Sequence, residues 1–165
     1  MQIEGRATCL GDDIDTDTIF PGRYLAVLDP RDQSRHLFEP LGEEMRQRAV
    51  AGRVLVAGHN FGCGSSREHA VTSMIGGGIR LVVARSFARI YFRNAVNNGL
   101  AVVVCPDLVD AVKDGDAVRV DLSSGSAGWT GGAANFAPLP PELLKILAAG
   151  GLWASVGAVV NPEVA

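Results

Sequence analysis

Short apolar runs alternate with helix-like segments through the middle of the chain. The apolar runs lie at residues 53–57, 81–84 and 100–104, and their continuous hydrophobic character is typical of fully buried strands. The segments between them, residues 66–77 and 86–97, have helical periodicity, with Ser86 as a candidate N-cap and glycines as stop signals. This order predicts a mostly parallel sheet with right-handed crossovers.

The flanking segments add other elements. Residues 3–9 predict a strand, residues 10–24 a polar loop, residues 41–50 a helix, residues 116–122 a half-exposed strand, residues 123–134 a hairpin and residues 142–149 a short helix. No linker divides the chain, so we expect one domain over residues 1–165. The fold class is therefore α/β, with a mostly parallel central sheet, flanking helices and an added β-hairpin.

Composition and charge narrow the class of protein. Of the 165 residues, 47% are hydrophobic and 20% are charged, which suits a folded core and argues against disorder. The net charge of −3 argues against nucleic acid or an anionic membrane as a partner. The start of the chain lacks a signal-like apolar segment, and no apolar run reaches the roughly 20 residues of a membrane span. We therefore expect a soluble cytoplasmic protein.

The cysteines do not form a metal or disulfide pattern. Cys9, Cys63 and Cys105 are an odd, widely spaced set, unlike a disulfide framework or a zinc or iron–sulfur motif. We expect no metal site in this chain. Cys63 lies in the most reactive-looking segment, but no signature of a cysteine hydrolase surrounds it, so we interpret it as a neutral loop thiol.

Residues 60–69, Asn-Phe-Gly-Cys-Gly-Ser-Ser-Arg-Glu-His, carry most of the candidate chemistry. A strand, a glycine loop and a helix start in this order form an anion site. Gly62 and Gly64 permit a tight turn, and Arg67 can bind a carboxylate through two parallel hydrogen bonds. Ser65 or Ser66 can act as a base whose anion the arginine and the helix end stabilise. The alternative is structural: a serine caps the helix and Arg67 pairs with a surface acid.

Two further clusters have open interpretations. The acidic run at residues 12–17 does not match an EF-hand, so it is either a solvated loop or the source of an acid that orients an arginine or relays a proton, with Arg23 at the site. Arg89 and Arg93 share one face of the helix at residues 86–97, which we interpret as mainly structural. Asn94 near its end bonds backbone groups or faces a partner, and His69 holds a loop or shuttles a proton.

These motifs, taken together and in order, resemble the swivel domain of the aconitase superfamily. The resemblance rests on residues 60–69, on Asp-Thr-Asp at residues 15–17 with Pro-Gly-Arg-Tyr-Leu at 21–25, and on Phe-Ala-Arg-Ile at 87–90. It extends over about residues 5–153. As a separate short chain, the sequence is similar to the small subunits of 3-isopropylmalate dehydratases in their compact archaeal-type form. The resemblance implies a swivelling β/β/α domain that closes over a large subunit.

The resemblance also implies roles and partners. The reaction is the dehydration and rehydration of a hydroxy dicarboxylate, and the large subunit holds a [4Fe-4S] cluster that supplies the Lewis acid. Ser65 matches the base that removes the carbon-bound proton, and Asp17 matches a catalytic acid. Residues matching substrate-binding positions are Gly64, Ser66, Arg67 and Arg23. The chain alone would then hold half of an active site for a small dicarboxylate. Self-association of the isolated chain stays open as an alternative.

Substrate choice in this family depends on the loop after residue 25. Here Ala26 and Val27 begin an aliphatic stretch, which suits the isopropyl group of 2-isopropylmalate and 3-isopropylmalate in leucine biosynthesis. Homoaconitate, 2,3-dimethylmalate and other alkylmalates stay open as alternative substrates, in part because residues 70–76 depart from the usual family segment. An alternative of another class is a non-catalytic domain that binds carboxylates.

Overall fold

One mixed sheet organises the part of the chain that the structure, a computed structural model, describes, which is residues 1–160. Its seven strands lie in the order β4-β3-β2-β1-β5-β6-β7. The strands are β1 (Gln2–Cys9), β2 (Arg53–Ala57), β3 (Leu81–Ala84), β4 (Ala101–Val104), β5 (Ala117–Asp121), β6 (Ser126–Trp129) and β7 (Gly132–Asn135). The single-domain prediction also covers residues 161–165, which lie outside the described residues.

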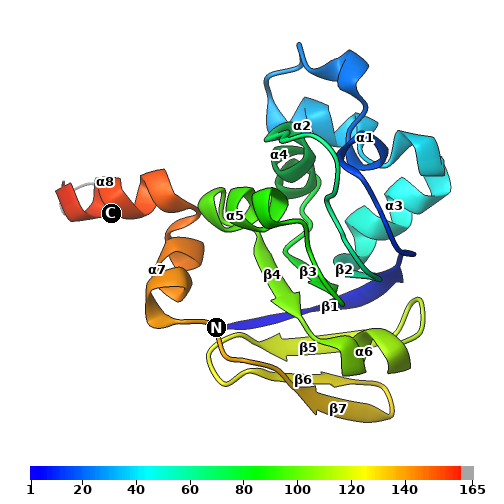
Figure 1. Ribbon diagram of the computed structural model, residues 1–165, viewed down its shortest axis with the longest axis vertical. Helices are drawn as coiled ribbons and strands as arrows, with labels where there is room; N and C mark the ends of the chain where they lie inside the picture. The colour runs from blue at the N-terminus through cyan, green and yellow to red at the C-terminus, as the bar shows by residue number, and fades with distance from the viewer. Residues whose placement is uncertain (161–165) are drawn as a thin grey trace.

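The sheet has a parallel half and an antiparallel half. Strands β1 to β4 pair in parallel, whereas β5, β6 and β7 add to β1 as an antiparallel meander. Figure 1 shows helices α1 to α4 above the parallel strands and β5 to β7 below them. The predicted α/β class, the parallel order over residues 53–104 and the hairpin are confirmed.

Helices connect and cover the strands. The α-helices are α1 (Thr16–Ile19), α2 (Pro30–Gln33), α3 (Glu43–Gly52), α4 (His69–Gly76), α5 (Arg89–Asn97), α6 (Pro106–Ala111), α7 (Pro141–Ala149) and α8 (Leu152–Val160). Short 3-10 helices lie at Gly22–Tyr24, Ser34–His36 and Glu39–Leu41. In Figure 1, α8 extends from the body beyond α7. Within the described residues, no helix has the length and apolar character that a membrane span requires.

Strands β2, β3 and β4 are buried on both faces, which explains their continuous apolar sequences. In β2, Leu55 packs into one core with α4 and α5, while its neighbours Val54 and Val56 pack into a second core with α6 and β5. Because successive side chains of a strand point to opposite faces, one run of valine and leucine serves both cores. The sheet is thereby fixed on both sides, and its loops extend from a rigid base.

Several predicted boundaries are wrong in instructive ways. The helix predicted from residue 66 begins at His69, and α5 has Ala88 rather than Ser86 as its N-cap. The loop predicted at residues 10–24 contains α1, because the Asp15 side chain accepts a hydrogen bond from the Thr18 amide at 2.6 Å and caps that helix. Residues 106–111 and 152–160 form α6 and α8, which the apolar pattern did not indicate.

Candidate active site

The loop between β2 and α4 is held on two sides by neighbouring loops. The Gly62 amide donates to the Ile14 carbonyl at 2.8 Å, and the Thr16 amide donates to the Cys63 carbonyl at 2.9 Å. On the other side, the Phe61 amide donates to the Ser86 carbonyl at 3.0 Å. These segments follow β1, β2 and β3, so the motif lies at the carboxyl edge of the parallel strands, where open α/β sheets bind ligands.

Two glycines give the loop its shape. Gly62 has φ of 78° and Gly64 has φ of 90°, in the region that favours glycine. A Cβ atom on Gly62 would overlap Cγ of Tyr91, so this side chain of α5 packs directly on the Gly62 backbone. On Gly64 a Cβ atom would meet nothing closer than 3.4 Å. Gly62 is therefore required for packing and conformation, and Gly64 for conformation alone.

The two serines of the motif lie in the loop, ahead of the helix. Both are exposed, and the N-cap of α4 is Glu68, without a side-chain capping bond. The capping interpretation is therefore wrong, and so is the expectation that the start of a helix stabilises a serine anion. Ser65 Oγ instead lies 3.4 Å from Thr16 Oγ1, and Asn94 Nδ2 donates to Ser66 Oγ at 3.4 Å.

Arg67 is oriented by groups from the α1 region. Its guanidinium forms an ion pair with Asp17 and donates to the Phe20 carbonyl at 3.4 Å. Hydrogen bonding from Arg67 lowers the pKa of Asp17, and the Gly22 amide, which donates to the same carboxylate at 3.2 Å, acts in the same direction. Only 18% of the Arg67 side chain is exposed, compared with 59% of Asp17. Asp17 thus stays ionised and holds the arginine in place.

A pocket of about 310 Å³ opens beside these groups. Residues of three segments line it: Thr16, Gly62, Gly64, Ser65, Ser66, Arg67, Ala88, Arg89, Ile90, Tyr91 and Asn94. Of the sequence-predicted site residues, the pocket brings together the two serines, Gly64 and Arg67. Asp17 pairs with Arg67 but is not among the residues that line the pocket. A hydroxyl, a serine pair and two arginines on one surface can bind a carboxylate and move a proton beside it.

Arg23 and the predicted specificity loop lie outside this pocket lining. Arg23 pairs with Glu39 and lies over the Tyr24 ring, 4.9 Å from its centroid, with 61% of its side chain exposed. Gln33, which is buried, donates from Nε2 to the carbonyls of Val27 at 2.9 Å and Leu28 at 3.2 Å. These two hydrogen bonds from a side chain of α2 therefore fix the backbone of the loop that contains Ala26 and Val27.

Two other side chains of the motif, Cys63 and His69, do not line the pocket. Partial burial, followed by the charges of Asp15 and Asp13, raises the pKa of Cys63, which confirms the interpretation of a neutral thiol. His69 stacks on Phe20 with ring centroids 5.6 Å apart, so it fixes the α1 region against α4. Within residues 1–160, no three histidine, cysteine or acidic side chains are grouped to hold a metal ion.

The structure adds three side chains that the sequence-based site did not include. Thr16, Arg89 and Asn94 line the pocket with Ser65. Each belongs to a motif that the sequence singled out, but as part of an acidic loop or of a structural helix. Their place after predicted strands could have identified them. These motifs follow β1 and β3, which neighbour β2, so their first residues meet at the same edge of the sheet as the site loop.

Comparison with known proteins gives concordant results. Residues 13–107 match the family described as the aconitase C-terminal domain. The 3-isopropylmalate dehydratase small subunit 1 of Methanopyrus kandleri is 50% identical over 152 residues, which cover 91% of this chain and 89% of that protein. The 3-isopropylmalate dehydratase small subunit of Moorella thermoacetica is 43% identical over 166 residues, covering 99% and 100%.

A solved structure agrees with these relatives over the whole fold. A crystal structure of 3-isopropylmalate dehydratase from Methanocaldococcus jannaschii superposes with a TM-score of 0.89 at 40% identity and covers 100% of both chains. The loop at residues 60–68, Asp17 and the first turn of α5 all lie within the matched aconitase segment. The chain therefore belongs to the aconitase C-terminal domain family and, within it, to the 3-isopropylmalate dehydratase small subunits.

Proposed function

We propose that the chain is the small subunit of a cytoplasmic hydro-lyase that interconverts 2-isopropylmalate and 3-isopropylmalate in leucine biosynthesis. The observation that carries the proposal is the exposed Ser65 hydroxyl, 3.4 Å from Thr16 Oγ1, in a pocket that also contains Arg67 and Arg89. Free thiols at Cys9, Cys63 and Cys105 suit a reducing compartment.

Ser65 acts as the base in this proposal. Its oxygen takes the carbon-bound proton next to a substrate carboxylate, the electron pair of the C–H bond forms the double bond, and the hydroxyl leaves from the adjacent carbon. Rehydration with the opposite orientation gives the isomer. A serine anion forms only where positive charge stabilises it, and Arg67 and Arg89 supply that charge at the pocket.

The two arginines have different roles in binding substrate. Arg67 is held by Asp17 and by the Phe20 carbonyl, so its orientation is fixed before substrate arrives. We assign it the carboxylate next to the reacting carbon, and Asp17 is its positioning residue. Arg89 begins α5 and belongs to no ion pair within residues 1–160, so it is available to a second carboxylate. Ser66, Gly64 and Asn94 complete the polar wall.

Departure of the hydroxyl needs a Lewis acid, and within residues 1–160 no three histidine, cysteine or acidic side chains are grouped to hold a metal ion. Cys9 ends β1, Cys63 lies in the site loop, and Cys105 is buried after β4, so the three thiols lie on different elements. An iron–sulfur cluster on the large subunit would supply the Lewis acid when the two subunits combine.

Substrate specificity follows from the loop after Tyr24. Ala26 is exposed and Val27 half-buried, and the hydrogen bonds from Gln33 fix their backbone. This loop offers aliphatic side chains and no cation at residues 26–28, which favours an isopropyl group over a third carboxylate. Arg23, paired with Glu39, stands at the base of the same loop and becomes a carboxylate ligand only if that ion pair opens.

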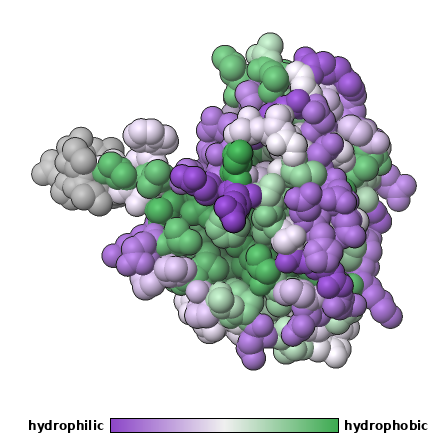
Figure 2. Space-filling view, in the orientation of Figure 1, coloured by the Kyte–Doolittle hydropathy of each residue, from purple (hydrophilic) through white to green (hydrophobic). Residues whose placement is uncertain are grey.

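The large subunit is proposed to cover the face next to the pocket. Ile90 lines the pocket and is 55% exposed, and Arg89 is shared with a second hollow of about 440 Å³ that includes Phe92, Arg93 and Val104. Figure 2 shows a broad apolar area below the position of α5. A partner with apolar side chains ringed by carboxylates would complement this face and close the site.

Reconstitution with the large subunit of a 3-isopropylmalate dehydratase tests the proposal. We expect turnover of both isomers, and we expect Ser65→Ala to lower kcat about a thousandfold while subunit association is unchanged. Ser124→Ala, in the exposed turn after β5, is the matched control. Arg93→Glu should instead weaken association in sedimentation experiments. Full turnover by Ser65→Ala would disprove the role of the serine, and binding of carboxylates without turnover would favour the non-catalytic alternative.

A further inference from the structure

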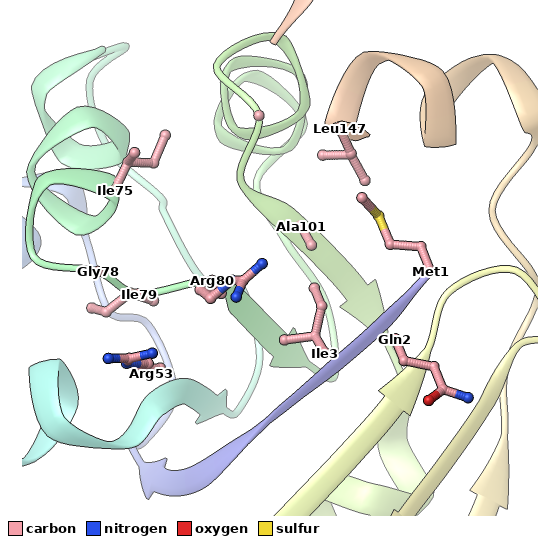
Figure 3. Close-up of a pocket in the computed structure, with 11 residues that line it drawn as sticks. Met1, Gln2, Ile3, Arg53, Ile75, Gly78, Ile79, Arg80, Ala101 and Leu147 are labelled. Carbon is pink, nitrogen blue, oxygen red and sulfur yellow. The ribbon is translucent and has the colours of Figure 1, made fainter. Parts of the chain in front are cut away.

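A second pocket lies at the opposite edge of the parallel strands. It has a volume of about 500 Å³. Its lining comes from the amino ends of β1 to β4, from the segment after α4 and from α7 (Figure 3). Strands of four or five residues separate it from the site loop by roughly 15 Å. It shares no lining residue with the pocket around Ser65.

Two arginines mark one side of this pocket. Arg53 is the first residue of β2, and Arg80 directly precedes β3; their backbones are joined by a 2.9 Å hydrogen bond from the Arg80 amide to the Arg53 carbonyl. Both side chains are exposed, and neither takes part in an ion pair within residues 1–160. Like charges on neighbouring strands repel, so an anion between or beside them is favourable.

The rest of the pocket is aliphatic. The buried side chains of Ile3, Ile79, Ala101 and Leu147 form its wall, with the exposed Ile75 and Met1 at its rim. Figure 3 shows both guanidinium groups near Ile79, with Leu147 and Met1 facing each other at the other end. The pocket is thus amphipathic: positive charge at one end and a branched aliphatic surface at the other.

The backbone conformation at Arg53 is unusual for a residue with a side chain. Arg53 follows α3 with φ of 66°, the left-handed conformation in which helices usually place glycine. A side chain there costs about 1 kcal/mol relative to glycine. Arg53 therefore occupies a backbone position that favours glycine, and a use of its guanidinium would account for the arginine found there.

We propose that this pocket binds a small carboxylate with a branched aliphatic tail. The carboxylate lies between the guanidinium groups of Arg53 and Arg80, and the tail covers Ile3, Ile79 and Ala101. This site is separate from the proposed dehydratase site and does not depend on it. A carboxylate of about five or six carbons fits within the volume of about 500 Å³ and fills part of it, since clefts of this size also hold drug-sized ligands.

Binding of isocaproate tests the proposal. Acetate keeps only the carboxylate of isocaproate, and isohexanol keeps only its branched aliphatic tail, so these two serve as comparison ligands. We expect isocaproate to shift the amide resonances of Ile79, Arg80 and Ala101 in the full chain, with saturation at or below about 10 mM. Acetate and isohexanol should each bind at least tenfold more weakly. The absence of shifts with isocaproate at that concentration would disprove the site.

Variants separate the two halves of the pocket. Arg80→Gln and Arg53→Gln should each weaken isocaproate at least tenfold and leave isohexanol unchanged. Arg119→Gln, whose arginine pairs with Glu4 on the exposed surface of β5, is the matched control and should bind normally. Equal binding of isohexanol and isocaproate would disprove the role of the arginines, and equal binding of acetate would disprove the role of the aliphatic wall. Because all of this is measured without the large subunit, the result is independent of the proposed dehydratase activity.

Discussion

Both edges of the parallel strands carry arginines, but these arginines differ in burial and in ion pairing. At the carboxyl edge, Arg67 is mostly buried and is held by Asp17 and a backbone carbonyl. At the amino edge, Arg53 and Arg80 are exposed and belong to no ion pair in the described residues. Both edges present guanidinium groups to a pocket, but only one has its arginine fixed in advance.

The difference indicates what each edge is suited to do. Catalysis depends on charge that is in place before the transition state forms, so the cost of orienting Arg67 is met during folding. Reversible binding of a small anion needs only charge that is available. The parallel half of the sheet thus provides a preorganised site at one edge and an adaptable one at the other.

The strongest test of this contrast is the loss of the fixed arginine. We expect Arg67→Ala to lower kcat/KM of the reconstituted enzyme 100- to 1000-fold, or roughly 3–4 kcal/mol, because charge develops next to this residue in the transition state. Arg53→Gln, at the other edge, should leave kcat/KM unchanged. An Arg67→Ala enzyme with unaltered kcat/KM would contradict the assigned role.

A second test concerns the backbone that presents the serines. Gly62→Ala should destabilise the fold by about 2–4 kcal/mol, because the new methyl group meets the buried Tyr91 ring and the residue has a positive φ. Gly64 also has a positive φ, but a new methyl group there would make only ordinary van der Waals contact with Thr16, so Gly64→Ala should cost about 1–2 kcal/mol. Urea unfolding of the two variants measures the difference. Equal losses would mean that the Tyr91 contact contributes nothing.

The sequence singled out the side chains that meet at the carboxyl edge because most of them lie in one short segment. Residues 60–69 contain the serines and Arg67 with the glycines that shape their loop, and the pocket brings these residues together. Arg89 and Asn94 were missed as site residues because their helical spacing equally suits a surface helix. Only the pairing of β2 with β3 brings the start of α5 against the Gly62 backbone.

The features that could not be predicted from the sequence are those that depend on contacts between residues far apart in the chain. The start of α4 was placed too early, since Ser65 and Ser66 are common capping residues and the competing contacts with Thr16 and Asn94 are far away in sequence. No sequence motif indicates the pocket at the amino edge. Its two arginines are 27 positions apart in the chain (80 − 53) and meet only through strand register.

A third test, with a smaller expected effect, concerns the ion pair between Asp17 and Arg67. Because Arg67 lowers the pKa of Asp17, the stabilisation from this pair is complete above the usual aspartate range and is lost as pH falls through the lowered pKa. Asp17→Asn should therefore reduce the loss of stability as pH falls below the usual aspartate range, with little change near pH 7 because the carboxylate is exposed. In the reconstituted enzyme it should raise KM and lower kcat through Arg67, and Asp17→Glu should restore part of both.

Thermal unfolding across the pH range, together with kinetics at neutral pH, measures both effects. Asp32→Asn is the control, since it removes an exposed carboxylate that pairs with Arg35 at 3.4 Å outside the site. A structural role alone would change stability and leave the kinetic constants as they are. Such a result would contradict the positioning role of Asp17.

The smallest expected effect, Arg53→Gly, tests the contrast at the other edge. If Arg53 serves ligand binding and not the fold, Arg53→Gly should raise the free energy of unfolding by up to about 1 kcal/mol, because glycine suits the positive φ and removes the repulsion with Arg80. The same variant should lose isocaproate binding. Gain of stability with loss of binding is the signature of a residue kept for function, whereas a loss of stability would mean that Arg53 serves the fold. Chemical denaturation with and without isocaproate distinguishes these outcomes, because a ligand that binds only the folded state adds stability in proportion to its affinity.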